Sequence, residues 1–239
     1  MATQFLSKNM PKHPAHYQTL EFNRISTLVN KYAADKGAPL NILDFGCGHG
    51  KFSHLFTTQG NFVTSVDVNP DYIDILNSQG LKAQRTEEFF AQPVEKFDLI
   101  LLSHVIEHLT PEQLVKLIPE LCQRLKKDGK LILISPTPGD RFYHDFSHVR
   151  PYLPQSIRHA FGQTGAPISY GEVKIIKMVD VYFFKDPFRT RLWRSFYTGN
   201  SISMGITKQI NIFFDLLWKI SKGHIGVHAS WLGVYKADT

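Results

Sequence analysis

Two hydrophobic patterns alternate along the first half of the chain. Short continuous apolar runs are typical of buried strands, and the segments between them carry apolar residues at helical spacing. Strands that alternate with helices specify a parallel sheet with right-handed crossovers and helices on both faces. The predicted fold class is therefore a doubly wound α/β fold. Its strands are expected at 41–45, 62–67, 81–84, 96–103 and 130–135, and its helices at 17–32, 51–59, 70–77 and 110–125.

The predicted helix at 110–125 has a clear start and one anomaly. Thr110 and Gln113 form a capping-box pattern at its beginning. Pro119 falls inside the apolar pattern and predicts a kink or a restart, because proline has no amide hydrogen to donate. Residues 127–129 are expected to close the helix.

The second half of the chain is less regular. A polar segment rich in histidine and proline precedes a short predicted helix at 156–163, and two further strands are expected at 172–181 and 230–235. Between these strands lies an insertion, residues 185–224, within a single expected domain of residues 1–239. It carries seven Lys or Arg against two Asp, and the aromatic residues Phe188, Trp193, Phe196, Tyr197, Phe213, Phe214 and Trp218.

Residues 206–222 of the insertion show a narrow polar stripe along an otherwise apolar helix. Basic residues beside aromatic ones on such a helix are typical of a membrane-interface element. A lid over the domain or a dimer contact would carry the same pattern. The sequence leaves these three roles open.

The most informative local feature is a glycine-rich turn after the first strand. Gly46, Gly48 and Gly50 occupy alternate positions, unlike the Gly-x-Gly-x-x-Gly turn that packs a pyrophosphate against a helix. Asp67 ends the next strand, where a carboxylate can accept both hydroxyls of a ribose. A ribose-binding acid beside such a loop indicates a nucleoside without phosphates, of which S-adenosylmethionine is the common one.

The loop from Asp44 to Gly48, together with Asp67 and the run at 97–109, resembles class I S-adenosylmethionine-dependent methyltransferases over residues 38–140. The resemblance implies a Rossmann-like, mostly parallel seven-stranded sheet, with the last two strands antiparallel at its edge. It also implies S-adenosylmethionine as cofactor and assigns roles to residues. The methionine end would contact Asp44, Gly46 and Gly48, the ribose Asp67, and the adenine Val68, Thr86 and Glu87, while Ser103 and His104 would line the reaction face.

A metal site is one further possibility that the resemblance raises. Some relatives, including small-RNA 2′-O-methyltransferases and ubiquinone-pathway O-methyltransferases, hold a divalent metal with Glu-x-x-Glu-His after the fourth strand. This chain has His104, Glu107 and His108 at the matching positions. Because the first glutamate is replaced, we expect no metal and a turnover that resists chelators.

The loop at 143–152 is the second candidate for catalysis. It resembles the Asp-x-x-His-x-Arg-x-Tyr segment of bacterial methyltransferases that act on glycans, lipids or other small acceptors. Histidine is suited to accept a hydroxyl proton near neutral pH, which makes His148 the candidate base. Asp145 could orient it, and Arg150 could bind an anionic group. Alternatively, His148 and Arg150 only pin the loop over the cofactor.

Charge and composition narrow the setting. The net charge of +6 and pI of about 9.2 favour an anionic partner such as nucleic acid, anionic lipid or phosphorylated glycan. Two cysteines, Cys47 and Cys122, imply no disulfide framework. With no signal-like or spanning apolar run, we expect a cytoplasmic protein, with peripheral contact to the inner face of a membrane left open.

The sequence thus predicts transfer of a methyl group from S-adenosylmethionine to an oxygen or nitrogen of a small-molecule, glycan or lipid-linked acceptor. An RNA methyltransferase is the alternative among enzymes, supported by the basic pI but by no visible RNA-binding module. A cofactor-binding but inactive partner subunit is the alternative from another class.

Overall fold

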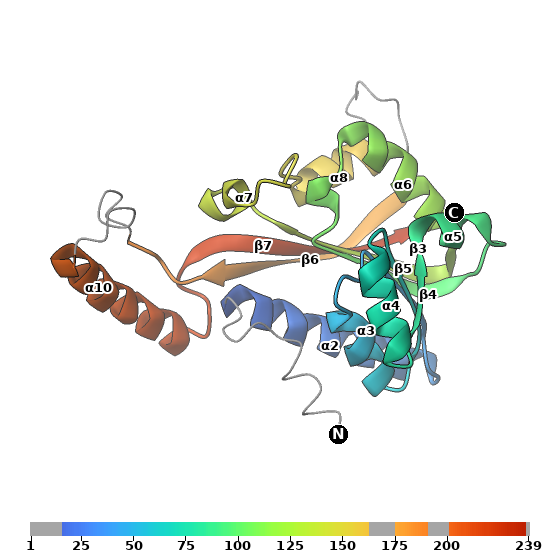
Figure 1. Cartoon of the computed structure of the whole chain (residues 1–239), viewed down its shortest axis with the longest axis horizontal. Coiled ribbons are helices and arrows are strands. Elements are labelled where there is room, and N and C mark those ends of the chain that lie inside the picture. The colour runs from blue at the N-terminus through green and yellow to red at the C-terminus, as the bar shows by residue number, and fades with distance from the viewer. Residues whose placement is uncertain (1–15, 163–174, 191–200, 238–239) are drawn as a thin grey trace.

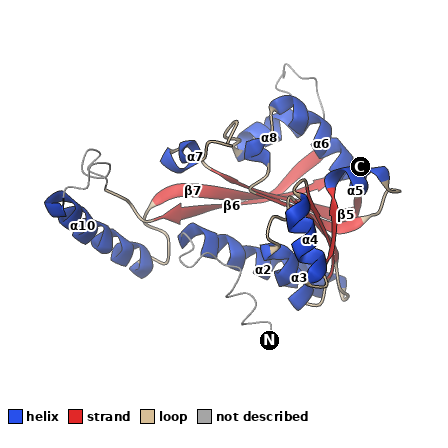
Figure 2. Ribbon diagram, in the orientation of Figure 1, coloured by secondary structure: helices blue, strands red, loops and turns tan. Residues whose placement is uncertain are grey.

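The computed structural model describes residues 16–162, 175–190 and 201–237. Its centre is a seven-stranded sheet in the order β3-β2-β1-β4-β5-β7-β6, with helices on both sides (Figures 1 and 2). The strands are β1 (Asn41–Phe45), β2 (Phe62–Asp67), β3 (Lys82–Arg85), β4 (Phe97–Ser103), β5 (Leu125–Pro136), β6 (Ile176–Asp186) and β7 (Val227–Ala237). The helices are α2 (His16–Lys36), α3 (Lys51–Thr58), α4 (Pro70–Ser78), α5 (Thr86–Ala91), η1 (Ile106–His108), α6 (Pro111–Gln123), α7 (Asp140–His144), α8 (Pro154–Phe161) and α10 (Ser201–Ile220).

Strand direction confirms a doubly wound, mostly parallel sheet. The first five strands pair in parallel, so the carboxyl ends of β1, β2, β4 and β5 lie along one edge. β7 is antiparallel to both of its neighbours, β5 and β6. The expectation that both last strands run antiparallel is therefore wrong for β6, which has the direction of β5. β7 is the one that reverses, because it returns along β6 after the insertion.

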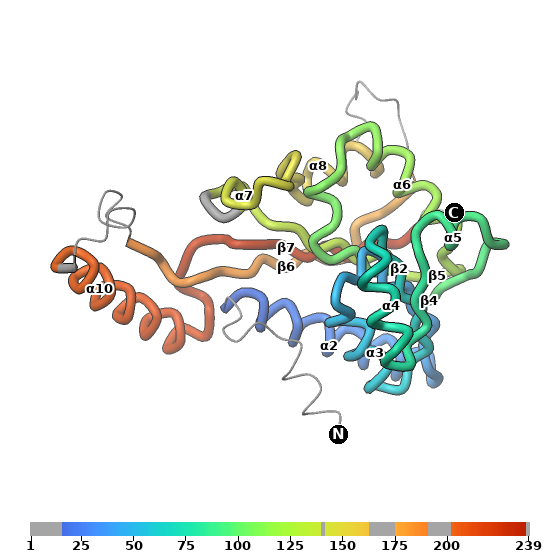
Figure 3. The backbone as a smooth tube through the Cα atoms, in the orientation of Figure 1, coloured from blue at the N-terminus to red at the C-terminus, as the bar shows by residue number. Residues whose placement is uncertain are grey.

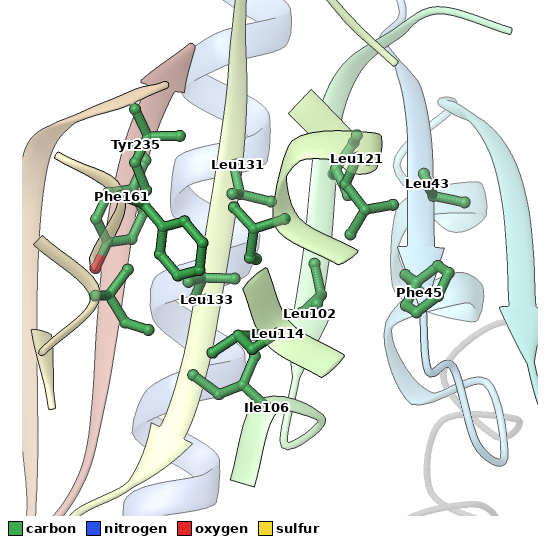
Figure 4. Packing of buried hydrophobic residues seen from close by; sticks show 14 of the residues in the cluster. Leu43, Phe45, Leu102, Ile106, Leu114, Leu121, Leu131, Leu133, Phe161 and Tyr235 are labelled. Carbon is green, nitrogen blue, oxygen red and sulfur yellow. The ribbon is translucent and has the colours of Figure 1, made fainter. Parts of the chain in front are cut away.

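Both faces of the sheet are buried, which explains the continuous apolar runs. Alternate residues of a strand point to opposite faces. Leu43 and Leu102 belong to the cluster under α6 and α8, which Figure 4 shows. Ile42 and Leu101 belong to the opposite cluster, under α2 and α3. Each fully buried Leu or Ile side chain contributes about 1.5–3 kcal/mol relative to exposure.

Several element boundaries differ from the sequence-based ones. α5 was not predicted, because it has six residues and follows β3 without a turn. β5 begins at Leu125, which the apolar pattern had placed in the preceding helix, since Leu125 pairs with Phe97 before a register shift. α6 runs without a break through Pro119 and ends at Gln123. Pro119 therefore causes no restart.

The second half confirms a short helix, two strands and an amphipathic helix, with shifted limits. β6 extends to Asp186, five residues beyond its expected end at Val181, because its pairing with β7 continues to Val227. The expected strand start at 172–174, the helix end at Gln163, and Trp193, Phe196 and Tyr197 of the insertion lie outside the described residues. Figure 3 shows α10 beyond the far end of the β6–β7 pair.

No helix among the described residues combines the length and the hydropathy needed to cross a membrane.

Candidate active site

The glycine loop between β1 and α3 makes a tight turn at the carboxyl end of β1. The amides of Gly46 and Cys47 both donate to the carbonyl of Val66 in β2, at 2.7 and 3.0 Å. Gly46 has φ 74°, and a Cβ there would lie 2.3 Å from Cγ2 of Val105. Gly48 has φ 51°, but a Cβ there would meet nothing within 4 Å. Glycine at 46 therefore allows close packing, whereas glycine at 48 borders open space in which a ligand can approach the backbone.

Asp67 at the end of β2 is bound to this loop. One carboxylate oxygen accepts from the Gly48 amide at 2.8 Å, and the other accepts from the Asn69 amide at 2.9 Å. Asn69 is the residue that caps α4. Each carboxylate oxygen keeps a further lone pair, so Asp67 can shape the loop and still accept from a ribose. The next residue, Val68, is 67% exposed although it is apolar.

Asp44 is the penultimate residue of β1, beneath the loop, and is buried. Burial raises the pKa of its carboxyl group to about 6, although a hydrogen bond from Ser53 acts in the opposite direction. The Ser53 hydroxyl donates to Asp44 at 2.6 Å, and the Ser65 hydroxyl donates to Ser53 at 2.8 Å. A positively charged ligand group would find a carboxylate held in a fixed position here.

The remaining residues assigned to the cofactor lie at the ends of β3 and β4. Thr86 and Glu87 begin α5, directly after β3. Glu87 is exposed and forms an ion pair with Arg85 at 3.3 Å. Ser103 is the last residue of β4 and is partly exposed. All three therefore lie at the carboxyl edge of the sheet, where open α/β proteins bind their ligands.

His104 lies between two buried glutamates. Its Nδ1 is 3.1 Å from Glu107, and its Nε2 is 3.2 Å from Glu21 of α2. Burial alone would lower the pKa of His104, but the charge of Glu21 and the hydrogen bonds to both glutamates raise it to about 10. His104 is thus protonated near neutral pH and has both ring nitrogens in use. With both ring nitrogens bonded to glutamates, His104 has no free nitrogen to offer a substrate at the reaction face that the resemblance assigned to it.

His148 and Asp145 belong to the loop after α7 and lie beside His108 of η1. The rings of His108 and His148 meet edge to face, with centroids 4.8 Å apart. His148 Nε2 is 3.7 Å from Asp145, whose pKa is lowered by the hydrogen bonds that Ser147 donates. The structure thus brings together the end of β4 and the loop after β5, as expected from a parallel sheet.

The same loop is also fixed by its backbone. The amides of Val149 and Arg150 donate to the Glu107 carbonyl, at 2.8 and 3.3 Å. The Tyr152 hydroxyl donates to the Leu109 carbonyl at 3.0 Å. These bonds hold the loop against η1 and do not involve the His148 side chain.

Glu107, His108 and His148 form a group that could hold a metal ion, with one potential ligand atom from each within 4.8 Å of the others. His148 Nδ1 is 2.8 Å from the Phe142 carbonyl, and His108 Nδ1 is 3.2 Å from the Ser147 carbonyl. These carbonyls favour a proton on Nδ1 and leave each Nε2 as a ligand atom, as in known metal sites.

The buried Oε2 of Glu107 has no hydrogen-bond partner among the described residues, so the donor set fits a divalent ion. This set of possible metal ligands differs in one residue from His104, Glu107 and His108, the positions that match the metal motif in the sequence. His148 supplies the third group, because His104 is bound to the two glutamates.

Sequence reasoning missed Glu21. This residue is completely buried, accepts a hydrogen bond from the Ser230 hydroxyl and contacts His104 from 83 positions away. One signal was present: Glu21 precedes Ile25 and Leu28 on the apolar side of the predicted first helix. A charged residue on a buried helix face needs a partner.

Comparisons with known proteins identify the family. The sequence model of a family described as "Methyltransferase domain" matches residues 17–166. Ubiquinone biosynthesis O-methyltransferase of Xylella fastidiosa (strain M23) is 30% identical over 115 residues, which cover 45% of each chain. The protein of the same name from Xanthomonas oryzae pv. oryzae (strain PXO99A) is 29% identical over 145 residues, or 56% of each chain. The chain thus spans about half the length of the curated relatives that it matches.

Solved structures show the same fold at low identity. A SAM-dependent methyltransferase from Archaeoglobus fulgidus superposes with a TM-score of 0.57 at 21% identity, covering 90% of this chain and 94% of that one. Coclaurine N-methyltransferase, bound to N-methylheliamine and SAH, gives a TM-score of 0.55 at 14% identity, with coverages of 88% and 71%. The chain therefore belongs to the class I methyltransferases, which use S-adenosylmethionine as methyl donor.

Proposed function

We propose that this protein transfers the methyl group of S-adenosylmethionine to a hydroxyl oxygen of a small-molecule acceptor. The observation that carries the proposal is the placement of His148 beside Glu107 and His108 at the carboxyl edge of the sheet. The similarity to curated O-methyltransferases supports an oxygen acceptor. Of the acceptor classes suggested by the sequence, glycan and lipid-linked compounds fall within this proposal when they offer a free hydroxyl.

The cofactor residues are assigned from their positions along the edge. Asp67 accepts from the ribose hydroxyls, and the exposed Val68 packs on the adenine, whose edge meets Thr86 and Glu87. The open space at Gly48 admits the methionine end, and Asp44 with Gly46 shapes that part of the loop. Ser103 faces the reacting groups, and His104 positions Glu107. When bound, the cofactor supplies an electrophilic methyl group on a positively charged sulfur.

The chain itself must then align the acceptor and remove its proton. The acceptor oxygen forms the new bond to the methyl carbon as the carbon–sulfur bond breaks. Its proton passes to Nε2 of His148, the nitrogen that the Phe142 carbonyl leaves unprotonated by holding Nδ1–H. The Asp145 carboxylate, 3.7 Å from Nε2, stabilises the imidazolium that results.

Removing this base tests the proposal. His148→Ala is expected to bind S-adenosylmethionine normally and to lose turnover by about 10²–10⁴-fold, the usual weight of general-base catalysis. The pH dependence of turnover that the wild-type enzyme shows should be absent from His148→Ala. Transfer of a labelled methyl group to a metabolite extract measures both, and His159→Ala on α8 is the matched control. Near-normal turnover with an unchanged pH profile would reduce His148 to a loop residue.

A second role, binding of a divalent metal ion, is favoured by the grouping of Glu107, His108 and His148. A divalent cation there would polarise the acceptor oxygen, and His148 would be a ligand instead of a base. Chelation separates the two roles. With a base alone, turnover resists EDTA, as the sequence predicts, and His108→Ala costs little. With a cation, EDTA abolishes turnover, added Mg²⁺ restores it, and His108→Ala is as damaging as His148→Ala.

The assay also discriminates the other two interpretations. Label that enters ribonuclease-sensitive material would favour the RNA methyltransferase. Retained cofactor binding with no labelled product from metabolite, lipid, glycan or RNA fractions would favour an inactive partner subunit. Recovery of label in an alkali-stable methyl ether of a small compound is the result that the proposal predicts.

A further inference from the structure

The helix α10 presents its apolar side to solvent. Ile202, Ile206, Phe213, Leu216 and Ile220 follow one another at intervals of four, seven, three and four residues, which places them on a single stripe. Their exposed fractions are between 53% and 77%. None of the helix residues from 202 to 220 is fully buried. A helix of this composition is normally buried along its apolar stripe.

The opposite side of α10 makes its contacts with the rest of the protein. Asn211 pairs with the backbone of Thr190, and the Trp218 indole donates to the Lys185 carbonyl at 2.8 Å. Phe214 packs on Phe188. The polar and aromatic side of the helix therefore faces inward, and the apolar stripe faces outward. Figure 1 shows the helix at one extreme of the molecule, clear of the sheet.

The charges around the stripe have one sign. Lys208 and Lys219 lie on the same flank, and Lys222 follows the helix; all three are exposed. The sole acidic residue of α10, Asp215, points to the inner side and is paired with Arg189 at 2.8 Å and with His16 at 3.4 Å. The outer surface of the helix thus combines apolar side chains with lysines that form no ion pair among the described residues.

This charge distribution selects the partner. In a pair of identical helices, the flanks normally carry residues of opposite charge that pair across the seam. A second copy of α10 would bring lysines with no acidic residue on either outer flank to meet them. Anionic lipid headgroups satisfy both features, because the apolar stripe enters the acyl boundary while lysines extend to the phosphates.

We propose that the outer face of α10 docks this protein on an anionic lipid bilayer. A cavity of about 760 Å³ lies directly inward of the helix, between Phe214, Phe188 and the residues Thr137–Gly139 that follow β5. The same stretch of chain continues into α7 and the loop of His148. Docking would therefore place this cavity, which is lined by both apolar and polar side chains, between the membrane surface and the loop of His148. The proposal goes beyond the methyl-transfer function and does not depend on it.

Vesicle co-sedimentation of the full chain, without cofactor or acceptor, tests the docking. We expect binding to vesicles of equal parts phosphatidylcholine and phosphatidylglycerol, little binding to pure phosphatidylcholine, and release as salt is added. Ile206→Ser with Phe213→Ser should lower the partition coefficient by about 10- to 100-fold. The matched control is Phe62→Ser, which removes a 69% exposed aromatic residue from β2, far from α10.

A second pair of variants isolates the charge. Lys208→Glu with Lys219→Glu should weaken binding to the anionic vesicles by at least about tenfold. Lys31→Glu with Lys116→Glu makes the same change of net charge on exposed residues of α2 and α6 and should not. No binding by the wild-type chain, equal binding to neutral vesicles, or equal effects of the two charge pairs would overturn the proposal. So would a dimer that Ile206→Ser with Phe213→Ser dissociates in the absence of lipid.

Discussion

His104 joins α2 to the end of β4 through its two glutamate partners. The backbone of His104 has the left-handed conformation, with φ 56°, which is uncommon for a residue other than glycine. Its contacts with Glu21 and Glu107 offset that strain and hold the Glu107 carboxylate toward the histidines of the loop. The His104 side chain therefore links α2, β4 and η1 through charged hydrogen bonds.

The raised pKa of His104 gives stability a defined pH dependence. A histidine whose folded pKa exceeds 6.5 contributes its full stabilisation below 6.5 and loses it as the pH rises toward about 10. The free energy of unfolding should fall across this window by several kcal/mol, at most about 5, because each pKa unit of the shift corresponds to about 1.4 kcal/mol. Urea titrations in EDTA at several pH values measure it.

The variant His104→Gln supplies the control for that series. It should lower stability at neutral pH and flatten the decline above it. An identical slope in His104→Gln and the wild type would show that another group titrates in this window.

The proximity of candidate site residues was predictable from sequence where it depends on local chain geometry. Gly46, Gly48 and Asp67 occupy one turn and the strand beside it, so their spacing alone indicated their proximity. The partners of His104 were not predictable in the same way. Glu21 reaches it from another helix, and only the packing of α2 on the sheet brings the two together.

The turn after β1 packs closely against Val105, in the segment after β4. Gly46→Ala would place a methyl group 2.3 Å from Val105 Cγ2 in a left-handed conformation. Gly60→Ala has the same conformational cost, at φ 83°, but meets nothing within 4 Å. We expect a loss of about 1–2 kcal/mol for Gly60→Ala and a further 1–3 kcal/mol for Gly46→Ala, by thermal or urea unfolding.

Trimming the neighbour completes this test. Adding Val105→Ala to Gly46→Ala should recover part of the extra loss, because it removes the clashing methyl group. Equal stabilities of Gly46→Ala and Gly60→Ala would contradict the close packing of β1 against residue 105.

Element boundaries were predictable where hydrophobic period and turn residues agree. The limits of β1 and β2 follow from their apolar runs and flanking turns. Leu125 was misplaced, because its apolar side chain fits both the face of the preceding helix and the first pair of β5 with β4. The hydrophobic pattern cannot distinguish these two when a helix joins a strand without a glycine or proline between them.

Across the whole molecule, the carboxyl edge of the sheet and α10 mark two distinct surfaces. The edge is formed by the ends of β1, β2, β4 and β5, and its chemistry follows from the parallel topology. The sequence could not choose among lid, interface and membrane element for the insertion, because the side of α10 that faces inward depends on contacts distant in the chain. The contacts of Asn211, Phe214 and Trp218 determine that side.

Binding of S-adenosylmethionine, measured by calorimetry, tests the central claim most directly. The wild-type chain should bind it, and Asp67→Ala should weaken binding by about 1.5–3 kcal/mol through loss of charged hydrogen bonds to the ribose. Asp71→Ala, an exposed acid at the start of α4, is the matched control and should bind normally. Thermal melts of each variant check that the loop remains folded. Absence of binding by the wild type, or equal affinity in Asp67→Ala, would contradict the account.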